Sequence, residues 1–221
     1  MANPKIFAWN CGGLRDSTAK TRSKVMFFEK EFKNKFDIFF FLETHHKSKA
    51  EIPKEILRYE NTHHIIHSAT TDSETHTGII GLIRNDYDLV STKDVIQGRI
   101  LNIRIEHRTE KTYFNLTAVY FDTNRNMNKD KMLNIVRKLR FEMENGSNNI
   151  ILGDFNFIDY EKDKAGGLSS TDKAVNKIWS PFLDEMDMVD PFREQNPKRR
   201  VWSFIGSGAA GNSRIDVRKC T

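Results

Sequence analysis

The sequence predicts an α/β fold in which two packed, mostly antiparallel β-sheets are flanked by helices. Runs of strand length outnumber the segments with helical spacing, and the helical segments are interspersed among these runs along the chain. With 221 residues, the chain fits one large domain better than two and is long enough to bury a proper core. We therefore expect a single domain over residues 1–221.

The predicted strands are short apolar or alternating runs that end at turn residues. Residues 37–43 form a continuous apolar run that ends in an acid, whereas apolar and polar residues alternate over 101–105, so that one face of that strand meets solvent. A last strand begins at Ser213 and stops almost at once, by Val217. The other predicted strands cover residues 5–9, 64–68, 77–84, 87–96, 113–120, 150–152 and 201–205.

Two long segments, 18–35 and 128–143, repeat apolar residues at helical spacing with charged residues between them. In the first, Val25, Phe28 and Phe32 lie on one stripe, which predicts a helix with one face turned toward the core. A short helix is expected over 50–57 and another over 171–184, interrupted by Pro181, while 190–193 and 196–200 are rich in turn residues.

Composition favours an intracellular protein with a polyanionic partner. The net charge is +5 and the sequence pI is about 9.1. The two cysteines, Cys11 and Cys220, cannot form a disulfide framework and fit a reducing compartment. The sequence has no apolar run of signal-peptide or membrane-spanning length. We expect a nuclear or cytoplasmic protein that is not secreted and has no membrane partner.

The stretch 149–156 carries the most informative local pattern. Apolar residues 150–152 run into a Gly-Asp-Phe-Asn turn. Asp154 and Asn156 are two residues apart, so in extended geometry both side chains leave the same face of the strand. A carboxylate beside an amide at a strand end can hold a water molecule and contact a phosphate. A polar turn whose side chains cap the backbone explains the tetrapeptide equally well.

Polar residues also lie at the ends of other predicted strands. Asn10, Glu43 and Asp216 join Asp154 in this pattern, and a further strand ends at Tyr120. Strands of one sheet bring their ends together, and hard oxygen ligands are those that Mg²⁺ and Mn²⁺ prefer. Each residue also has a structural explanation, as a turn former, as a strand end in solvent or as an ion-pair partner.

Taken in order, these motifs resemble the endonuclease/exonuclease/phosphatase family, which includes exonuclease III, apurinic endonucleases and pancreatic-type DNases. The resemblance covers roughly residues 4–217. The amino-acid sequences of the motifs are most similar to those of the endonuclease domain of non-LTR retrotransposon polyproteins, which also carry a reverse transcriptase. The resembling motifs are Trp-Asn-Cys-Gly-Gly at 9–13, Phe-Leu-Glu-Thr-His at 41–45, Thr-Gly-Ile-Ile-Gly-Leu at 77–82, Ala-Val-Tyr at 118–120, Gly-Asp-Phe-Asn at 153–156, Trp-Ser-Phe at 202–204 and Ser-Arg-Ile-Asp at 213–216.

The resemblance implies a four-layered α/β sandwich and a metal-dependent hydrolase that cleaves phosphodiester bonds. It implies that Glu43 is the main ligand of Mg²⁺, or of Mn²⁺, with Asn10 close to it. It also implies that Tyr120 hydrogen-bonds the scissile phosphate. On the same basis Asp154 orients or deprotonates the attacking water, Asn156 fixes that geometry, and Asp216 belongs to the carboxylate set around the metal.

The sequence departs from the family pattern at three places. Gly12 stands where the family often has a polar residue, and Thr123 stands where it usually has an asparagine. The family ends in Ser-Asp-His on a final strand, whereas only five residues follow Asp216 here and the last histidine is His107. We therefore expect a C-terminally truncated copy that lacks at least one core strand and whose activity is in question.

Several basic residues are candidates for contact with DNA phosphates, although each can equally lie on a solvated face. A zinc site at His63, His64 and His67 is a weaker candidate, because residues three apart in a strand face opposite ways. The candidates for DNA contact are Lys198, Arg199, Arg200 and Ser213, together with Lys20, Arg22 and Lys24 on the first helix.

Two functions remain open. The first is a Mg²⁺-dependent DNA endonuclease, as a monomer or as part of a polyprotein, that nicks target DNA to leave a 3′-hydroxyl for reverse transcription. The alternative is an inactive retroelement remnant with at most weak nucleic-acid binding.

Overall fold

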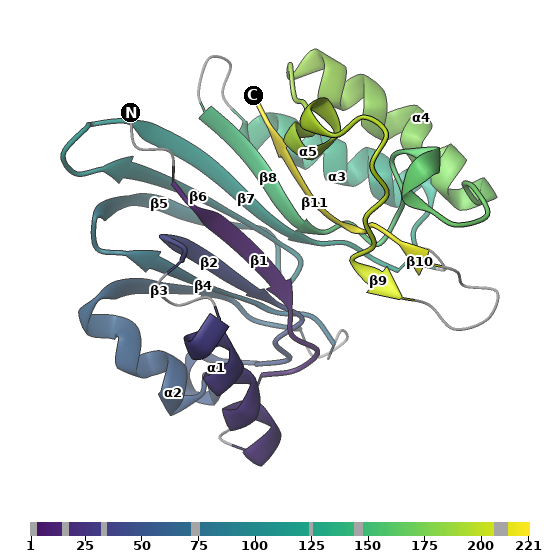
Figure 1. Ribbon diagram of the computed structural model, residues 1–221. Helices are drawn as coiled ribbons and strands as arrows, with labels where there is room; N and C mark the ends of the chain where they lie inside the picture. Colours follow the sequence, from purple (N-terminus) through teal and green to yellow (C-terminus); the bar gives the residue numbers. More distant parts are fainter. Residues whose placement is uncertain are drawn as a thin grey trace.

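The computed structural model describes residues 4–14, 18–31, 35–71, 76–123, 126–143, 148–205 and 212–221. Two β-sheets pack face to face, and helices cover the outer face of each, which gives the four layers visible in Figure 1. The predicted α/β sandwich is therefore confirmed. No helix in these ranges is both apolar enough and long enough to cross a bilayer.

The first sheet has the strand order β1-β2-β4-β3. Its strands are β1 (Ile6–Asn10), β2 (Ile38–Leu42), β3 (His63–Ser68) and β4 (Ile79–Arg84). β1 and β2 run parallel, while β4 is antiparallel to both of its neighbours. The outer face is covered by helices α1 (Ala19–Glu31) and α2 (Lys54–Leu57), with the 3₁₀ turns η1 (Lys49–Glu51) and η2 (Arg58–Asn61) beside α2.

The second sheet has the strand order β11-β8-β7-β6-β5. β7 and β8 are parallel and the other pairs are antiparallel. Its strands are β5 (Tyr87–Ile96), β6 (Ile100–His107), β7 (Tyr113–Tyr120), β8 (Asn148–Asp154) and β11 (Asp216–Cys220). The remaining elements are α3 (Lys129–Glu142), η3 (Glu161–Asp163), α4 (Ser170–Glu185), α5 (Pro191–Gln195), β9 (Phe204–Ile205) and β10 (Asn212–Ser213).

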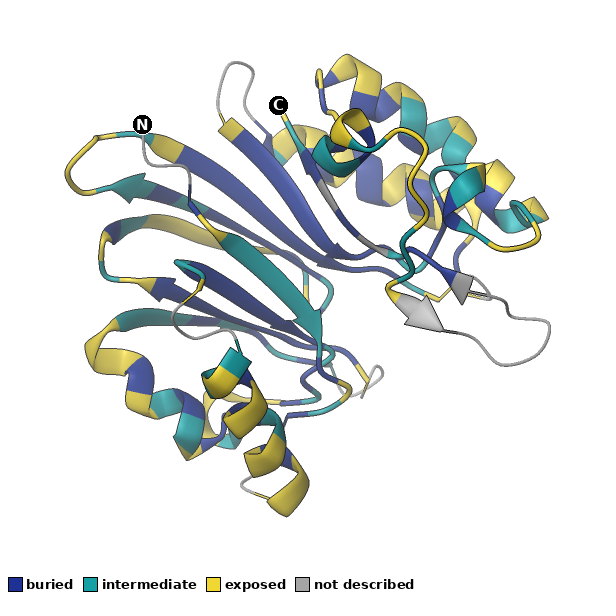
Figure 2. Ribbon diagram, viewed as in Figure 1, coloured by how far each residue is buried: buried dark blue, intermediate teal, exposed yellow. Residues whose placement is uncertain are grey.

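Three apolar clusters lie between these layers, and Figure 2 shows the buried strands at the centre. The cluster between the sheets includes Phe40 and Leu42 of β2 and Leu116 of β7. Phe28 of α1 belongs to the cluster under the first pair of helices, and Trp179 of α4 to the cluster under α3 and α4. Burial of this apolar area is the main force that holds the layers together.

Four boundaries in the second half of the chain differ from the sequence expectation. α4 continues through Pro181 instead of breaking there, because its apolar face stays packed and a proline removes only one backbone hydrogen bond. The segment 190–193 was predicted as a turn, but α5 begins there, with Asp190 as its N-cap. β9 is only two residues long, and β11 extends to Cys220 instead of stopping by Val217.

Candidate active site

The predicted site residues meet at one end of the sandwich, between the two sheets. β1 ends at Asn10, and Glu43 directly follows β2. On the facing sheet Tyr120 of β7 is in register with Asp154 of β8, which is in register with Asp216 of β11. The expectation that these strand ends belong to a single sheet was wrong, since each sheet supplies part of the set.

A hydrogen bond between Asn10 and Asp154 links the two sheets at this point. The Asn10 Nδ2 atom donates to Asp154 Oδ2 over 3.0 Å. The Asn10 Oδ1 atom accepts from the backbone N–H of Gly12 over 3.1 Å, so Asn10 shapes the turn and also contacts the carboxylate. Asp154 is only 3% exposed. A pocket of about 450 Å³ opens here, lined by Phe7, Ala8, Trp9, Asn10, Asp154, Ser203 and Ile215.

Gly153 explains how Asp154 comes so close to Tyr120. Its φ of 139° lies outside the range that L side chains favour. A Cβ at this position would stand 2.0 Å from the backbone oxygen of Val119. Only glycine therefore lets the end of β8 approach β7 this closely, and the Asp154 carboxylate is delivered to the inner edge of the sandwich.

Asp154 and Asn156 do not leave one face of a strand, because the strand ends at Asp154 and Asn156 has a φ of 51°. The Asn156 backbone N–H donates to Asp154 Oδ1 over 3.0 Å. The Asn156 Nδ2 atom donates to the Phe121 backbone oxygen over 2.9 Å. The turn is thus capped by its own side chains, and this capping fixes the orientation of the Asp154 carboxylate.

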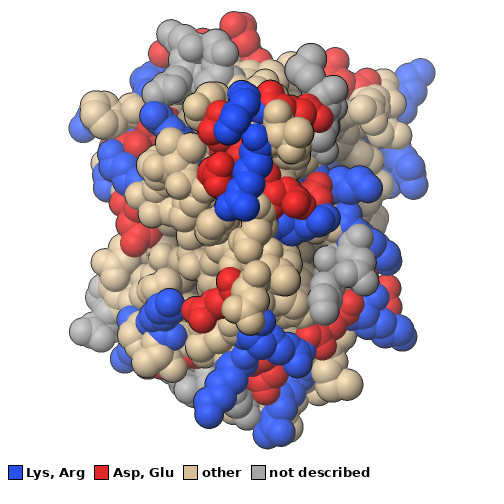
Figure 3. Space-filling view, turned by 90° about the vertical axis from the view of Figure 1, so that its left-hand side faces the viewer, with Lys and Arg blue, Asp and Glu red and all other residues tan. Residues whose placement is uncertain are grey.

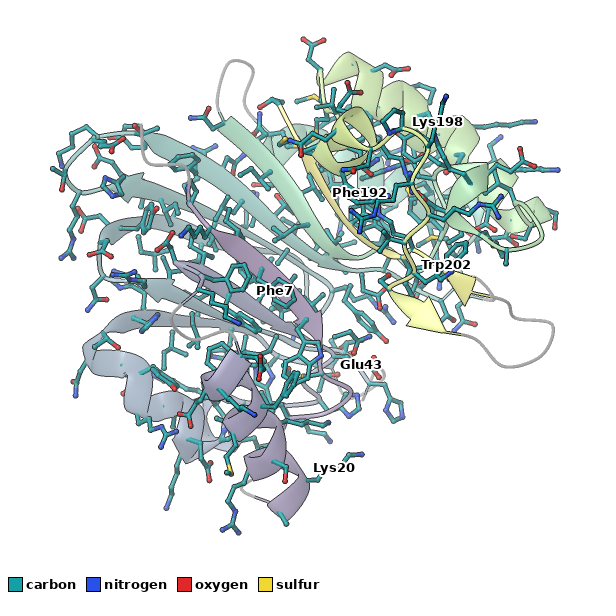
Figure 4. All side chains as sticks on the ribbon, in the orientation of Figure 1. Phe7, Lys20, Glu43, Phe192, Lys198 and Trp202 are labelled. Atoms are coloured by element: carbon teal, nitrogen blue, oxygen red, sulfur yellow. The ribbon has the colours of Figure 1, made fainter. Side chains whose placement is uncertain are left out.

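Glu43 lies just beyond β2, close to the end of β1 (Figure 4). Its φ is 56°, a left-handed conformation that is costly for a residue with a side chain. The carboxylate lies 3.3 Å from His45 Nε2. Burial, followed by the negative charge of Glu43 and a hydrogen bond with it, raises the pKa of Tyr120 well above its usual value. The phenol therefore keeps its proton at neutral pH, and its hydroxyl is hydrogen-bonded to Glu43.

These side chains suit a hard metal ion such as Mg²⁺. Glu43 supplies carboxylate oxygens just beyond β2, and Asn10, which has an amide oxygen, contacts Asp154 through its Nδ2 atom. In the described ranges, no three His, Cys, Asp or Glu side chains converge as a complete ligand set. Mg²⁺ takes few protein ligands and completes its shell with water and substrate phosphate. The neighbouring Cys11 is no ligand candidate, because burial raises the pKa of its thiol to about 12.

The other predicted site residues are less closely tied to this cleft. Ser213 is buried in β10, where its backbone oxygen accepts from the N–H of Ser203 over 3.0 Å. The backbone of Asp216 pairs with Asp154, but the Asp216 side chain and the loop 206–211 lie outside the described part of the chain. The roles predicted for Ser213 and Asp216 therefore stay predictions.

The basic candidates lie in two places. Lys198, Arg199 and Arg200 are exposed beyond α5, and in Figure 4 Lys198 lies far from Glu43, with Trp202 between them. Lys20 projects from α1 at the bottom of the same view, whereas Lys24 donates to backbone oxygens of the turn after β1. Figure 3 shows the side of the molecule that lies on the left in Figure 1, where Lys and Arg are interspersed with Asp and Glu.

The histidines expected as a weak zinc candidate are kept apart. His63 packs against Tyr59, and the His64 ring contacts the Tyr87 backbone oxygen. His67 instead pairs with His46 over 3.3 Å. Sequence reasoning did not find this pair, since the partners are 21 residues apart and join only when β3 packs beside the segment after β2.

No protein-family model matches the sequence, and no curated protein matches it. Solved structures do match the fold. An AP endonuclease from Archaeoglobus fulgidus has a TM-score of 0.73 at 15% identity, over 99% of this chain and 87% of that chain. The endonuclease domain of TRAS1, a telomere-specific non-LTR retrotransposon, has a TM-score of 0.66 at 16% identity, over 99% and 85%. The 3′ phosphatase NExo from Neisseria, bound to a product DNA hairpin, has a TM-score of 0.69 at 18% identity, over 99% and 87%.

The chain therefore has the fold of the endonuclease/exonuclease/phosphatase proteins, as the ordered motifs predicted. At these identities the likeness concerns the fold, and the same fold supports several chemistries. The case for a particular reaction therefore depends on the side chains at the junction of the two sheets.

Proposed function

We propose that this protein is a Mg²⁺-dependent phosphodiesterase that nicks DNA. The observation that carries the proposal is the contact of Asn10 with Asp154, which places a buried carboxylate from one sheet beside a metal-ligand candidate, Asn10, from the other. The fold neighbours support this class of reaction, since they include an AP endonuclease and a retrotransposon endonuclease domain.

Each side chain has a role in this reaction that its contacts support. The Asp154 carboxylate, oriented by the N–H of Asn156 and by Asn10, holds the attacking water and accepts its proton. The Tyr120 hydroxyl, which stays protonated, donates to a phosphate oxygen. Glu43 and Asn10 would hold a Mg²⁺ ion, and such an ion would supply stabilisation of the charge that develops on the phosphate and on the leaving oxygen.

The bond changes of the proposed reaction follow from these roles. The water oxygen bonds to phosphorus while the bond between phosphorus and the 3′ oxygen breaks. The 3′ oxygen takes a proton from solvent, so one side of the nick carries a 3′-hydroxyl and the other side carries a 5′-phosphate. A free 3′-hydroxyl can prime DNA synthesis, so a role in retrotransposition belongs to this proposal. Leu-Glu-Thr-His-His at 42–46, after β2, and Asp-Pro-Phe-Arg at 190–193, where α5 begins, resemble the corresponding motifs of retroelement endonucleases and support that role.

DNA as the substrate is supported by the charge of the chain. The net charge is +5, and Lys198 to Arg200 are exposed on the flank that follows α5. Phosphate contacts of this kind add affinity that does not depend on sequence and that falls as salt rises. We assign to these three residues the role of contacting the DNA phosphates and thereby positioning the protein on the DNA.

The test is the nicking of a supercoiled plasmid. We expect wild type to nick the plasmid with Mg²⁺ and to stop when EDTA is added. The Asp154→Asn variant should nick more slowly by a factor of roughly 10² to 10⁴, the range expected for a positioned acid–base group. Lys198→Ala is the matched DNA-binding control, which should weaken binding and lower its salt dependence but leave the maximal rate intact. A wild-type rate equal to that of Asp154→Asn would favour the inactive alternative.

A further inference from the structure

Lys24 of α1 contacts the turn that follows Asn10 and hydrogen-bonds the backbone of Glu43. Its Nζ atom donates to the backbone oxygen of Gly12 over 2.7 Å and to that of Gly13 over 2.6 Å. α1 is anchored by its buried residues Val25 and Phe28. The base of the lysine is therefore fixed by the core, and its ammonium group reaches over the turn 11–14.

The turn in question determines where Asn10 and Glu43 lie. Its amides extend the pairing of β1 with β2. The Gly13 N–H donates to the backbone oxygen of Glu43 over 2.7 Å, and the Leu14 N–H donates to the backbone oxygen of Thr44 over 2.8 Å. The Gly12 N–H donates to Asn10 Oδ1. The two glycines whose carbonyls Lys24 binds thus use their own N–H groups to hold the two candidate ligands.

The turn needs such support because two adjacent glycines leave its backbone free to adopt several conformations. Gly12 and Gly13 have φ values of 55° and 90°. The segment that they hydrogen-bond is itself strained, since Glu43 has a φ of 56°. Glycines have large conformational freedom, and a left-handed glutamate is disfavoured. A charge-assisted hydrogen bond to each glycine carbonyl selects one arrangement of the turn from those that two adjacent glycines allow.

We propose that Lys24 is a positioning residue, whose ammonium group locks the Gly12-Gly13 turn and thereby sets Asn10 and Glu43 at the spacing that a metal ion requires. The catalytic consequence rests on the proposed function. The sequence placed Lys24 among possible phosphate contacts, but the backbone oxygens of the turn already use two of its three N–H donors. Its role is thus directed inward, toward the site.

The ammonium group also has an electrostatic role that an uncharged donor would lack. Glu43 and Asp154 are two carboxylates at one cleft, and Asn10 bridges from the turn to Asp154. Lys24 supplies a fixed positive charge near Glu43. This charge reduces the repulsion between the two carboxylates before a metal ion binds.

The test compares Lys24→Met, Lys24→Arg and the control Lys30→Met on the full chain. Methionine keeps the length and loses the donors, arginine keeps the charge and two donors, and Lys30 lies near the C-terminal end of the same helix, with a side chain that is 83% exposed. The first readout is amide hydrogen exchange by NMR. Lys24→Met should speed the exchange of the Gly13 and Leu14 amides about tenfold or more, the effect expected for a lost charge-assisted hydrogen bond.

Two further readouts separate positioning from general stabilisation. We expect Mn²⁺ affinity, measured by calorimetry, to fall by about tenfold in Lys24→Met, and kcat for nicking to fall by a similar factor with KM for DNA unchanged. Lys24→Arg should recover part of each effect, and Lys30→Met should match wild type.

Three outcomes would overturn the proposal. They are unchanged exchange at Gly13 and Leu14, a lower melting temperature with unchanged Mn²⁺ affinity, and a change in KM alone, which would mean a DNA contact. If wild type neither nicks DNA nor binds Mn²⁺, the proposed function fails. In that case the exchange of Gly13 and Leu14 still decides whether Lys24 holds the turn.

Discussion

The two ends of the chain are held in place by opposite kinds of interaction. Under α1, aromatic rings pack on one another, with Phe28 and Phe39 centroids 4.5 Å apart and Phe39 and Phe41 centroids 4.6 Å apart. Around β11 and α5, buried charges pair instead. We call the second group the ion-pair cluster; its members are Asp159, Asp163, Asp190, Arg193, Arg214 and Lys219.

The ion-pair cluster joins segments that are distant in the sequence. Arg214 donates to Asp163 over 2.9 Å and to Asp190 over 2.6 Å. Asp190 also caps α5, and Arg193 of that helix donates to Asp163. Lys219 of β11, with a side chain only 1% exposed, donates to Asp159 over 2.6 Å. Three cations and three carboxylates thus tie η3, α5 and β11 together.

The difference shows which interactions a sequence pattern reveals. Apolar burial is non-directional and recurs at the period of the helix or strand, so it leaves a periodic signal. Ion pairing depends on geometry between partners that no local spacing relates. The comparison also suggests different responses to mutation and to pH, which the following experiments measure.

The largest effect is expected for Arg214→Met in the ion-pair cluster. The substitution leaves the carboxylates of Asp163 and Asp190 buried without one of their cations, which should lower the free energy of unfolding by roughly 3 to 5 kcal/mol. Urea denaturation measures this change. Arg140→Met is the matched control, since its ion pair with Glu185 is about half exposed on both sides and should cost less than about 1 kcal/mol. Equal losses in the two variants would contradict the distinction.

A second effect is expected from a neutral buried group on the aromatic side of the molecule. Burial, followed by the charge of His67, lowers the pKa of His46 from 6.5 to about 4. Below pH 6.5 the unfolded chain protonates His46 while the folded chain does not, so stability falls as pH drops through the window from 6.5 to 4. The loss attributable to this group is about 3 kcal/mol at the lower end.

The measurement is the free energy of unfolding against pH for wild type and His46→Gln. Between pH 4 and 6.5 the slope of the wild-type curve should exceed that of His46→Gln. The difference should correspond to at most one additional proton bound on unfolding. Parallel curves would show that His46 is not held neutral by the fold.

The smallest effect is expected for Phe28→Leu in the aromatic layer. Leucine fills most of the ring's space, so the expected loss is about 1 to 2 kcal/mol, from lost contacts and a small cavity. Thermal unfolding should show the same loss at low and high salt, because no charge is involved. A salt-dependent loss, or one larger than that of Arg214→Met, would reverse the order of the two regions.

The sequence predicted the fold well where periodicity determines it. β2, β5 and β7 lie within a residue or two of their predicted bounds, because their apolar runs are continuous or alternating. Two of the errors, at β11 and α5, lie in the ion-pair cluster. β11 reads as too polar for a buried strand until Lys219 is seen to pair with Asp159 and Asp190. α5 reads as a turn until Asp190 is seen to cap it.

The candidate site was predictable as a set of residues but not as an arrangement. Asn10, Glu43, Tyr120 and Asp154 stand at strand ends, and the structure brings these ends together. The strand order that distributes them over two sheets depends on long-range pairing, which local sequence does not encode. The contact of Lys24 with the turn was missed for the same reason, since a lysine at a helix start reads as exposed.

One measurement tests most directly the claim that both sheets build one reaction centre. It is the single-turnover nicking rate of Glu43→Gln, Asp154→Asn and the double variant, with protein in excess over plasmid. Each single variant should nick more slowly by a factor of roughly 10² to 10⁴. The double variant should be little slower than the slower single variant, because the effects of mutating groups that act as a unit do not add. Nicking at the wild-type rate in either single variant, or losses that multiply in the double variant, would contradict the account.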